Sequence, residues 1–218
     1  MHVIRLLRFG PAPETLACVE ADDPGAPGSG EVAVRMLYMP INPSDLLQTT
    51  GRYGAVQPAL PLDMGREGIG RVTAIGPGVT DRQLGDLVVP ILGPTWRTTL
   101  IRKSAGLIPL PTGIDHRQAA MLKANPATAL LMLRDIVKLA PGDWVIQNAA
   151  NSAVGTYLVR LAAKRGIRTL NLVRRTEAGA HLAAVPGASR DEVVRVVWGA
   201  DRSGRAKRRA IRWHAWNV

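Results

Sequence analysis

The sequence predicts two kinds of structure in succession, a β domain followed by an α/β domain. Up to about residue 110, short apolar runs alternate with turns rich in Gly, Pro and Asp, which is typical of an antiparallel barrel or sandwich. Between residues 144 and 175 the pattern changes to strand, tight turn, helix and strand, which is one βαβ unit. The 218 residues are enough for one large or two small domains with a real core.

The first region is predicted from short apolar runs with strong turns between them, such as Gly76-Pro77-Gly78. Helical signals begin near Asp115, which can cap a helix over residues 116–122, and a second helix starts at Asn125. We therefore place a domain boundary between residues 114 and 115. The apolar stripe expected on the second helix is Leu130, Leu133 and Val137. The expected strands cover residues 3–7, 32–39, 70–75, 87–91 and 99–101.

The segment 144–175 raises the question of function. An apolar run at residues 144–146 follows a Pro-Gly-Asp turn, and a second run, 169–173, ends at Arg174-Arg175. Gly166 ends the helix between the two runs as a C′ residue, after two basic residues in the last turn. The residues that repeat at helical spacing are Val154, Leu158, Leu161 and Ala162.

The tight turn before this helix suits a dinucleotide. A helix N-terminus offers free backbone N–H groups and a partial positive charge, which favour a pyrophosphate. Of the usual G-x-G-x-x-G fingerprint, only Gly155 keeps a glycine. Where an acidic residue would bind a ribose 2′-hydroxyl, the chain has Arg174 and Arg175, which favour the 2′-phosphate of NADPH over NADH. The alternative is an ordinary βαβ crossover with a solvated basic strand end.

The net charge of +11 is large enough to suggest a nucleic-acid-binding protein, but the distribution of the charge along the chain argues against one. More than half of the excess lies after residue 173 and includes the basic run 207–209, with Trp198, Trp213 and Trp216 nearby. A basic and aromatic arm can bind nucleic acid. Because no nucleic-acid-binding module accompanies it, a solvated or disordered tail is the favoured interpretation.

Other features of the sequence exclude several classes of protein. Cys18 is the only cysteine, which excludes an internal disulfide framework and a cysteine-rich zinc site. No apolar stretch approaches the length of a membrane span, and the first residues are a better β-strand than a signal peptide. We therefore expect a cytoplasmic protein, with an organelle as the open alternative, and with neither a membrane nor a nucleic acid as its partner.

Tyr53 lies in a short loop with the sequence Gly51-Arg52-Tyr53-Gly54. A tyrosine held between two glycines is positioned by its loop rather than packed. It is therefore a candidate hydrogen-bond donor or acid. The alternative is a loop tyrosine that caps the core.

Several short motifs occur in a fixed order along the first 176 residues. They are NPSD, GRYG, GREGIG, the Gly85-Asp86 turn, TWRT, NPATA and IQNAANSAVG. This order resembles the medium-chain dehydrogenase/reductase superfamily, and within it the mitochondrial-type trans-2-enoyl-thioester reductases, which are NADPH enzymes of fatty-acid synthesis. The resemblance implies a GroES-like β-barrel domain over residues 1–114 and a Rossmann NADPH-binding domain, truncated after its first part, over residues 115–176. Residues 177–218 form a basic tail that is atypical of the family.

The resemblance also implies the site residues. Enzymes of the family reduce the C=C bond of an enoyl thioester with NADPH, and Tyr53 matches their catalytic tyrosine. Zinc enzymes of the superfamily have a histidine ligand where this chain has Arg66, and a guanidinium cannot bind a cation, so no metal is expected. Glu67 is then expected to be a structural carboxylate or one that supports the site residues, with Arg66 as a candidate ion-pair partner. The matching cofactor contacts are Asn125, Asn151, Ser152, Ala153, Val154, Arg174, Arg175 and Thr176.

Two other functions stay open for the sequence. One is an NADPH quinone reductase of the same superfamily. The other is an inactive, truncated fragment with at most a cofactor-binding or scaffold role. The resemblance implies a small-molecule enoyl thioester as the substrate and a homodimer as the assembly.

Overall fold

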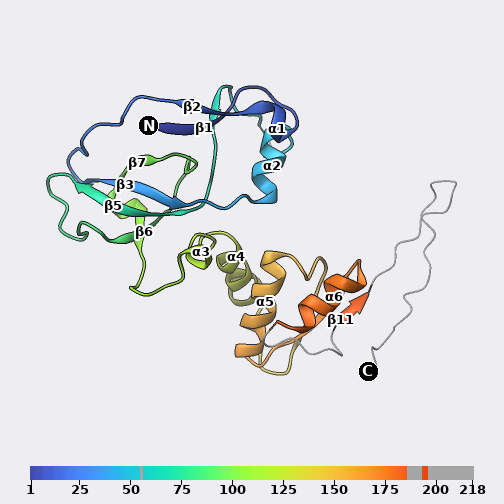
Figure 1. Cartoon of the computed structure of the whole chain (residues 1–218). Coiled ribbons are helices and arrows are strands. Elements are labelled where there is room, and N and C mark those ends of the chain that lie inside the picture. The colour runs from blue at the N-terminus through green and yellow to red at the C-terminus, as the bar shows by residue number, and fades with distance from the viewer. Residues whose placement is uncertain (55, 186–192, 196–218) are drawn as a thin grey trace. The chain divides into compact units, whose positions relative to one another are not determined.

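The computed structural model of the chain describes residues 1–54, 56–185 and 193–195 (Figure 1). The chain divides into two compact units, Met1–Lys123 and Ala124–Val218. None of the helices in these described ranges is long and apolar enough to cross a membrane. The basic run at 207–209 and the tryptophans near it lie outside the described residues.

A five-stranded antiparallel sheet forms much of the first unit, with the strand order β7-β3-β5-β6-β8 (Figure 1). Val32, Val34 and Met36 of β3 are buried together, because alternate side chains of a strand point to the same face. They pack with Val72 and Leu100 from the neighbouring strands. The strands are β3 (Glu31–Tyr38), β5 (Ile69–Ile75), β6 (Leu87–Pro90), β7 (Thr99–Lys103) and β8 (Leu107–Pro109).

A three-stranded antiparallel sheet, with the order β2-β1-β4, holds the other strands described in this unit. Leu6, Met64 and Trp96 form the core beside it. The described strands form two sheets rather than one closed barrel, so the β domain predicted for this region is confirmed but its closure is not seen. The strands are β1 (His2–Leu6), β2 (Leu16–Glu20) and β4 (Leu62–Asp63).

The expected strands are all present at nearly the expected bounds, whereas β2, β4 and β8 were not predicted. Strands β4 and β8 are too short to give an apolar run. Strand β2 pairs with β1 and carries Cys18 with its side chain exposed.

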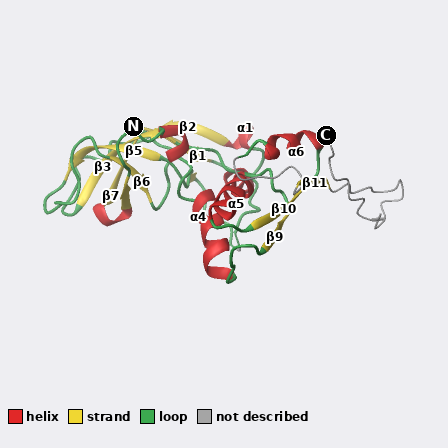
Figure 2. Ribbon diagram, turned by 90° about the horizontal axis from the view of Figure 1, so that it is seen from below, coloured by secondary structure: helices red, strands yellow, loops and turns green. Residues whose placement is uncertain are grey.

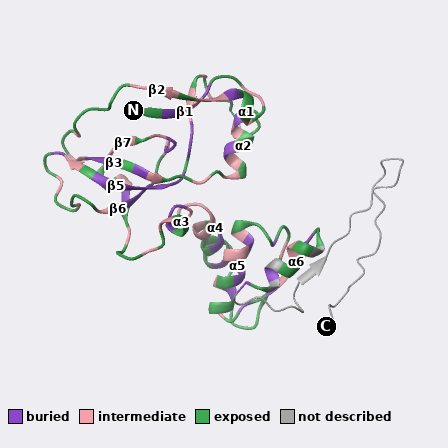
Figure 3. Ribbon diagram, viewed as in Figure 1, coloured by how far each residue is buried: buried purple, intermediate pink, exposed green. Residues whose placement is uncertain are grey.

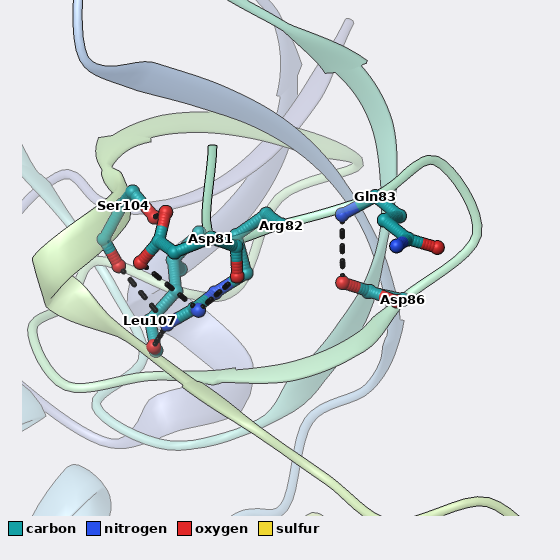
Figure 4. A network of polar contacts seen from close by, with 6 residues as sticks. All are labelled: Asp81, Arg82, Gln83, Asp86, Ser104 and Leu107. Atoms are coloured by element: carbon teal, nitrogen blue, oxygen red, sulfur yellow. Dashed lines mark hydrogen bonds and ion pairs between the residues drawn. The ribbon is translucent and has the colours of Figure 1, made fainter. Parts of the chain in front are cut away.

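A polar network holds the turn between β5 and β6 (Figure 4). The Ser104 hydroxyl donates to Asp81 Oδ1 at 2.6 Å, and Arg82 donates to the carbonyl oxygen of Leu107 at 2.5 Å. The hydrogen bond from Ser104 and, to a smaller extent, the charge of Arg82 hold the pKa of Asp81 below its usual value. Because Ser104 starts the 3₁₀-helix η1 (Ser104–Gly106), the network ties this turn to the segment between β7 and β8.

Helix α2 (Pro43–Thr49) begins within the NPSD motif. Asn42 is the N-cap residue, and its backbone N–H donates to Asp45 Oδ2 at 2.8 Å. Pro43 occupies the first helical position, where its missing N–H costs nothing. A shorter helix, α1 (Ala12–Thr15), precedes β2.

Helix α3 (His116–Ala119) is capped by Asp115, which accepts a hydrogen bond from the backbone N–H of Gln118 at 2.8 Å. The helix is shorter than the predicted 116–122, because after Ala120 the chain continues as hydrogen-bonded turns instead of a helix. Ala119 and Ala120 are buried with residues of the first unit, Ile69 and Val89. The boundary between the two functional domains, placed between residues 114 and 115 from the sequence, stays a prediction.

The second unit contains the predicted βαβ unit. Strands β9 and β10 run parallel, and β11 extends the sheet in the order β11-β10-β9 (Figure 2). Ser152 caps α5 by accepting a hydrogen bond from the backbone N–H of Gly155 at 3.1 Å, and Gly166 follows the helix with a φ of 67°. The elements are β9 (Trp144–Gln147), α5 (Ala153–Lys164), β10 (Arg168–Val173), α6 (Thr176–Ala183) and β11 (Val193–Arg195).

Helix α4 (Asn125–Leu131) packs against α5, which has a buried and an exposed face (Figure 3). Ala129 and Leu133 lie in one core with Leu158. Leu133 is buried as expected, but Leu130 and Val137 are 39% and 55% exposed, so the predicted stripe is wrong at both positions. A π-helical turn, η2 (Met132–Ile136), follows α4 and puts later residues out of phase with α-helical spacing.

Candidate functional site

The Tyr53 loop follows directly after helix α2. Gly51 and Gly54 have φ angles of 69° and 94°, in the left-handed region that favours glycine. The backbone N–H of Gly51 donates to the carbonyl oxygen of Gln48 at 3.1 Å, and that of Arg52 donates to the carbonyl oxygen of Leu47 at 3.0 Å. The loop therefore turns back on the helix end and leaves Tyr53 40% exposed.

The GREG segment, residues 65–68, passes beside this loop. Gly65 has a φ of 95°, and a Cβ atom there would lie 2.4 Å from Cδ1 of Trp96, so a side chain has no room. Thr95 donates its hydroxyl to the carbonyl oxygen of Glu67 at 2.8 Å. Packing against Trp96 and the bond from Thr95 fix the backbone on both sides of Arg66.

The side chain of Glu67 is buried, whereas that of Arg66 is exposed. Glu67 is 1% exposed, and its Oε2 accepts a hydrogen bond from the Asn42 side chain at 2.9 Å. Arg66 is exposed; its guanidinium carbon lies 4.8 Å from the centre of the Tyr53 ring, and its Nε donates to Gln48 Oε1 at 3.3 Å. The predicted structural role of Glu67 agrees with its burial.

Lys123 and Asp45 are functional-site neighbours that the sequence did not single out. The Lys123 ammonium donates to the backbone carbonyl oxygens of Arg66 and, at 2.9 Å, of Ile91. Burial lowers the pKa of Lys123 and raises the pKa of Asp45. Asp45 is 1% exposed, and within the described part of the chain its Oδ1 has no hydrogen-bond partner. Both residues are far from Arg66 in the sequence, so only the fold shows that they lie near it.

The loop between β9 and α5 has the shape expected of a phosphate-binding turn. Ala149 has a φ of 47°, so the chain reverses sharply after β9. A Cβ atom on Gly155 would lie 2.4 Å from the carbonyl oxygen of Ala150, so glycine is required at this position. Ser152 uses its hydroxyl oxygen to cap the helix. The N-terminal N–H groups of a twelve-residue helix therefore face a turn of small residues.

Both arginines at the end of β10 lie at the same sheet edge as this loop. Parallel pairing of β9 with β10 puts the carboxyl ends of both strands together, and the backbone N–H of Ala150 donates to the carbonyl oxygen of Leu172 at 3.3 Å. Arg174 and Arg175 follow β10 and are exposed. Thr176 begins α6, with Glu177 in its first turn. The residues brought to this edge are thus Asn151, Ser152, Ala153, Val154, Arg174, Arg175 and Thr176.

Comparisons with known proteins agree with this geometry. Residues 28–106 match the alcohol dehydrogenase GroES-like domain. The mitochondrial enoyl-[acyl-carrier-protein] reductase of Bos taurus is 47% identical over 154 residues, which is 69% of this chain and 41% of the relative. The mitochondrial 2-enoyl thioester reductase heterodimer from Candida tropicalis superposes with a TM-score of 0.75 at 30% identity, covering 89% of this chain and 60% of that chain.

In sequence and in fold, the chain is similar to members of the medium-chain dehydrogenase/reductase superfamily. The comparisons confirm the resemblance that the order of the motifs predicts. They also confirm the GroES-like and Rossmann-like fold class. A complex of the Candida enzyme with NADP and crotonyl-CoA matches with the same TM-score and coverage. A putative NADPH:quinone reductase from Bacillus thuringiensis superposes with a TM-score of 0.78 at 31% identity, covering 90% of this chain and 57% of that chain.

The chain spans 41% of the length of the bovine relative. The first unit holds Tyr53, Arg66 and Glu67, whereas the second holds the loop between β9 and α5 and the two arginines that follow β10. Asn125 lies in the second unit as the first residue of α4. Among the residues that the structure describes, no group of three His, Cys, Asp or Glu side chains could hold a metal ion.

Proposed function

We propose that the protein reduces the C=C bond of a 2-enoyl thioester with NADPH, without zinc, in fatty-acid synthesis. The observation that carries the proposal is the likeness to the Candida reductase, whose solved complex contains NADP and crotonyl-CoA. The identity to mitochondrial enoyl-[acyl-carrier-protein] reductases supports the same substrate class. The proposed domains are 1–114 for the substrate, 115–176 for the cofactor and 177–218 as a basic tail.

The residues of the second unit fit a dinucleotide. Gly155 lets the first turn of α5 pack against the backbone of Ala150, and the N-terminus of α5 favours the negative charge of a pyrophosphate. Arg174 and Arg175 provide guanidinium groups for a 2′-phosphate, and Thr176 follows them. Asn125 and Asn151 to Val154 complete the proposed contacts. NADPH supplies a hydride when bound, and the protein orients and shields it.

Tyr53 is the proposed catalytic residue. When a hydride reaches the β-carbon of an enoyl thioester, negative charge develops on the thioester oxygen. The exposed Tyr53 hydroxyl donates a hydrogen bond to that oxygen, or helps to protonate the α-carbon of the enolate. A hydroxyl and backbone donors are sufficient for this task, so the proposed reaction needs no metal.

The first test is cofactor binding. The tryptophan fluorescence of the purified chain should change with NADPH and much less with NADH, because Trp144 starts the strand that leads into the loop. Arg175→Ser should weaken NADPH binding by about 10-fold, as expected for loss of a charge-assisted hydrogen bond, and leave NADH binding unchanged. If NADPH and NADH bind equally well, the assignment of the arginines is wrong.

The second test is turnover of crotonyl-CoA with NADPH. The main alternative is quinone reduction, which the likeness to the Bacillus thuringiensis protein favours. Turnover of a quinone without turnover of crotonyl-CoA would select this alternative. Cofactor binding without either reaction would select the inactive fragment with a cofactor-binding or scaffold role.

The proposal also covers the oligomeric state of the protein and its compartment in the cell. A homodimer is proposed, and the solved relative from Candida tropicalis is a heterodimer of related chains. The cytoplasmic location stays a prediction, and the relatives from Bos taurus and Candida tropicalis are mitochondrial by name. Sedimentation of the purified chain tests the first point, and fractionation of the source cell tests the second.

A further inference from the structure

The Tyr53 side chain is partly exposed, on a loop that contains two glycines. Its exposed fraction is 40%, and the glycines on either side are the residues with the greatest backbone freedom. A hydroxyl that must meet a substrate oxygen within hydrogen-bonding distance needs a defined ring position. The loop backbone alone does not provide it, so a contact to the ring itself has to contribute.

The guanidinium of Arg66 makes such a contact. Its carbon lies 4.8 Å from the centre of the Tyr53 ring, within the range in which a cation is attracted to the face of an aromatic ring. Both ends of the arginine are held. Its Nε donates to the side chain of Gln48, and its carbonyl oxygen accepts a hydrogen bond from Lys123.

We propose that Arg66 is a positioning residue for Tyr53, and that Gln48 of α2 anchors it. This inference rests on the proposed function, since it acts through the proposed catalytic tyrosine. The cation holds the ring face and thereby limits the orientations of the hydroxyl. The planar guanidinium is suited to this, because it stacks on the ring while its Nε still donates to Gln48.

The kinetic test compares Arg66→Met with the parent chain in the crotonyl-CoA assay. Loss of an exposed cation–π contact should lower kcat by about two- to five-fold and leave the KM for NADPH unchanged. Arg66→Lys keeps a cation near the ring and should recover part of the loss. Arg52→Met is the matched control, because it removes a neighbouring exposed arginine, and it should keep the parent kcat. An unchanged kcat in Arg66→Met overturns the proposal.

A spectroscopic test does not depend on turnover. In a nitrogen-15 spectrum of the full chain, the Nε–H proton of Arg66 should be shifted upfield by the Tyr53 ring current. Tyr53→Leu should remove this shift, and Gln48→Leu should reduce it. A resonance that stays in place in Tyr53→Leu overturns the proposal even if the chain is an active reductase. A ring-current shift in a chain without reductase activity would instead reject the proposed function.

Discussion

Tyr53 lies partly exposed on a loop whose path is set by two glycines. The left-handed conformations of Gly51 and Gly54 would strain any other residue, so the two glycines fix the path of the loop. Arg66 then lies over the ring that this path presents. The glycines in the sequence make Tyr53 a candidate, but the sequence does not predict its contact with Arg66, because that contact joins two segments that are separate in the chain.

Replacing Tyr53 with Phe tests the proposed catalytic role. The variant keeps the ring and its contact with Arg66 but loses the hydroxyl. We expect kcat for crotonyl-CoA to fall by about 10²-fold, the lower range for loss of a general acid. NADPH affinity, measured by fluorescence titration, should stay unchanged. Equal turnover by the variant and the parent would remove Tyr53 from the mechanism.

Gly155, in the first turn of α5, packs closely against the loop between β9 and α5. In Gly155→Ala the new Cβ would lie 2.4 Å from the carbonyl oxygen of Ala150, so the loop must shift. We expect a loss of about 1–3 kcal/mol in the free energy of unfolding, together with weaker NADPH binding. Gly106→Ala is the matched control, because a Cβ there meets nothing within 4 Å. Urea unfolding followed by circular dichroism compares the two variants.

At the scale of elements, hydrophobic patterning predicted the longer strands and α5. Strand β3 is an apolar run that buries Val32, Val34 and Met36, and α5 repeats its apolar residues at helical spacing between Ser152 and Gly166. Patterning failed for β2, whose residues are partly exposed, and for the π-helical turn after α4. Both depend on tertiary contacts, which local sequence does not encode.

The contacts that organise the site were harder to predict than its motifs. The loop 149–155 and Arg174 and Arg175 could be placed at one edge, because parallel strands bring their carboxyl ends together. The bonds of Lys123 to two backbone carbonyls could not, since a lysine carries no sequence signal for such partners.

The turn between β5 and β6 gives the first unit a pH-dependent contact. Because the folded-state pKa of Asp81 is lowered, its carboxylate adds stability above the unfolded pKa of about 3.9, and this is lost as the pH falls through the folded-state pKa. Asp81→Asn should therefore lower the urea midpoint at neutral pH but not in strong acid. Asp22→Asn, at an exposed loop residue, is the control. Equal effects of Asp81→Asn at both pH values would contradict the assignment.

At the scale of the whole molecule, each unit has cores of its own. The clusters around Val34, Leu6 and Ile69 lie wholly in the first unit, and those around Leu158 and Val159 lie in the second. The first unit should therefore fold without the second. Helix α3 matters for this, since Ala119 and Ala120 complete the core around Ile69.

Two fragments test this statement. Residues 1–123 should unfold cooperatively in urea, whereas residues 1–114 lack α3 and should be less stable by roughly 2 kcal/mol because apolar area is no longer buried. Circular dichroism and tryptophan fluorescence, from Trp96, should report the same transition. Equal stability of the two fragments would favour the boundary predicted from the sequence at 114/115.

The surface position of Cys18 on β2 has a practical consequence. It is the only cysteine of the chain, and its thiol is exposed. A maleimide dye would therefore attach at one known place in the first unit, without any engineered residue. Energy transfer from a nicotinamide cofactor to that dye would then report how far the two units stand from each other in solution, and whether the substrate draws them together.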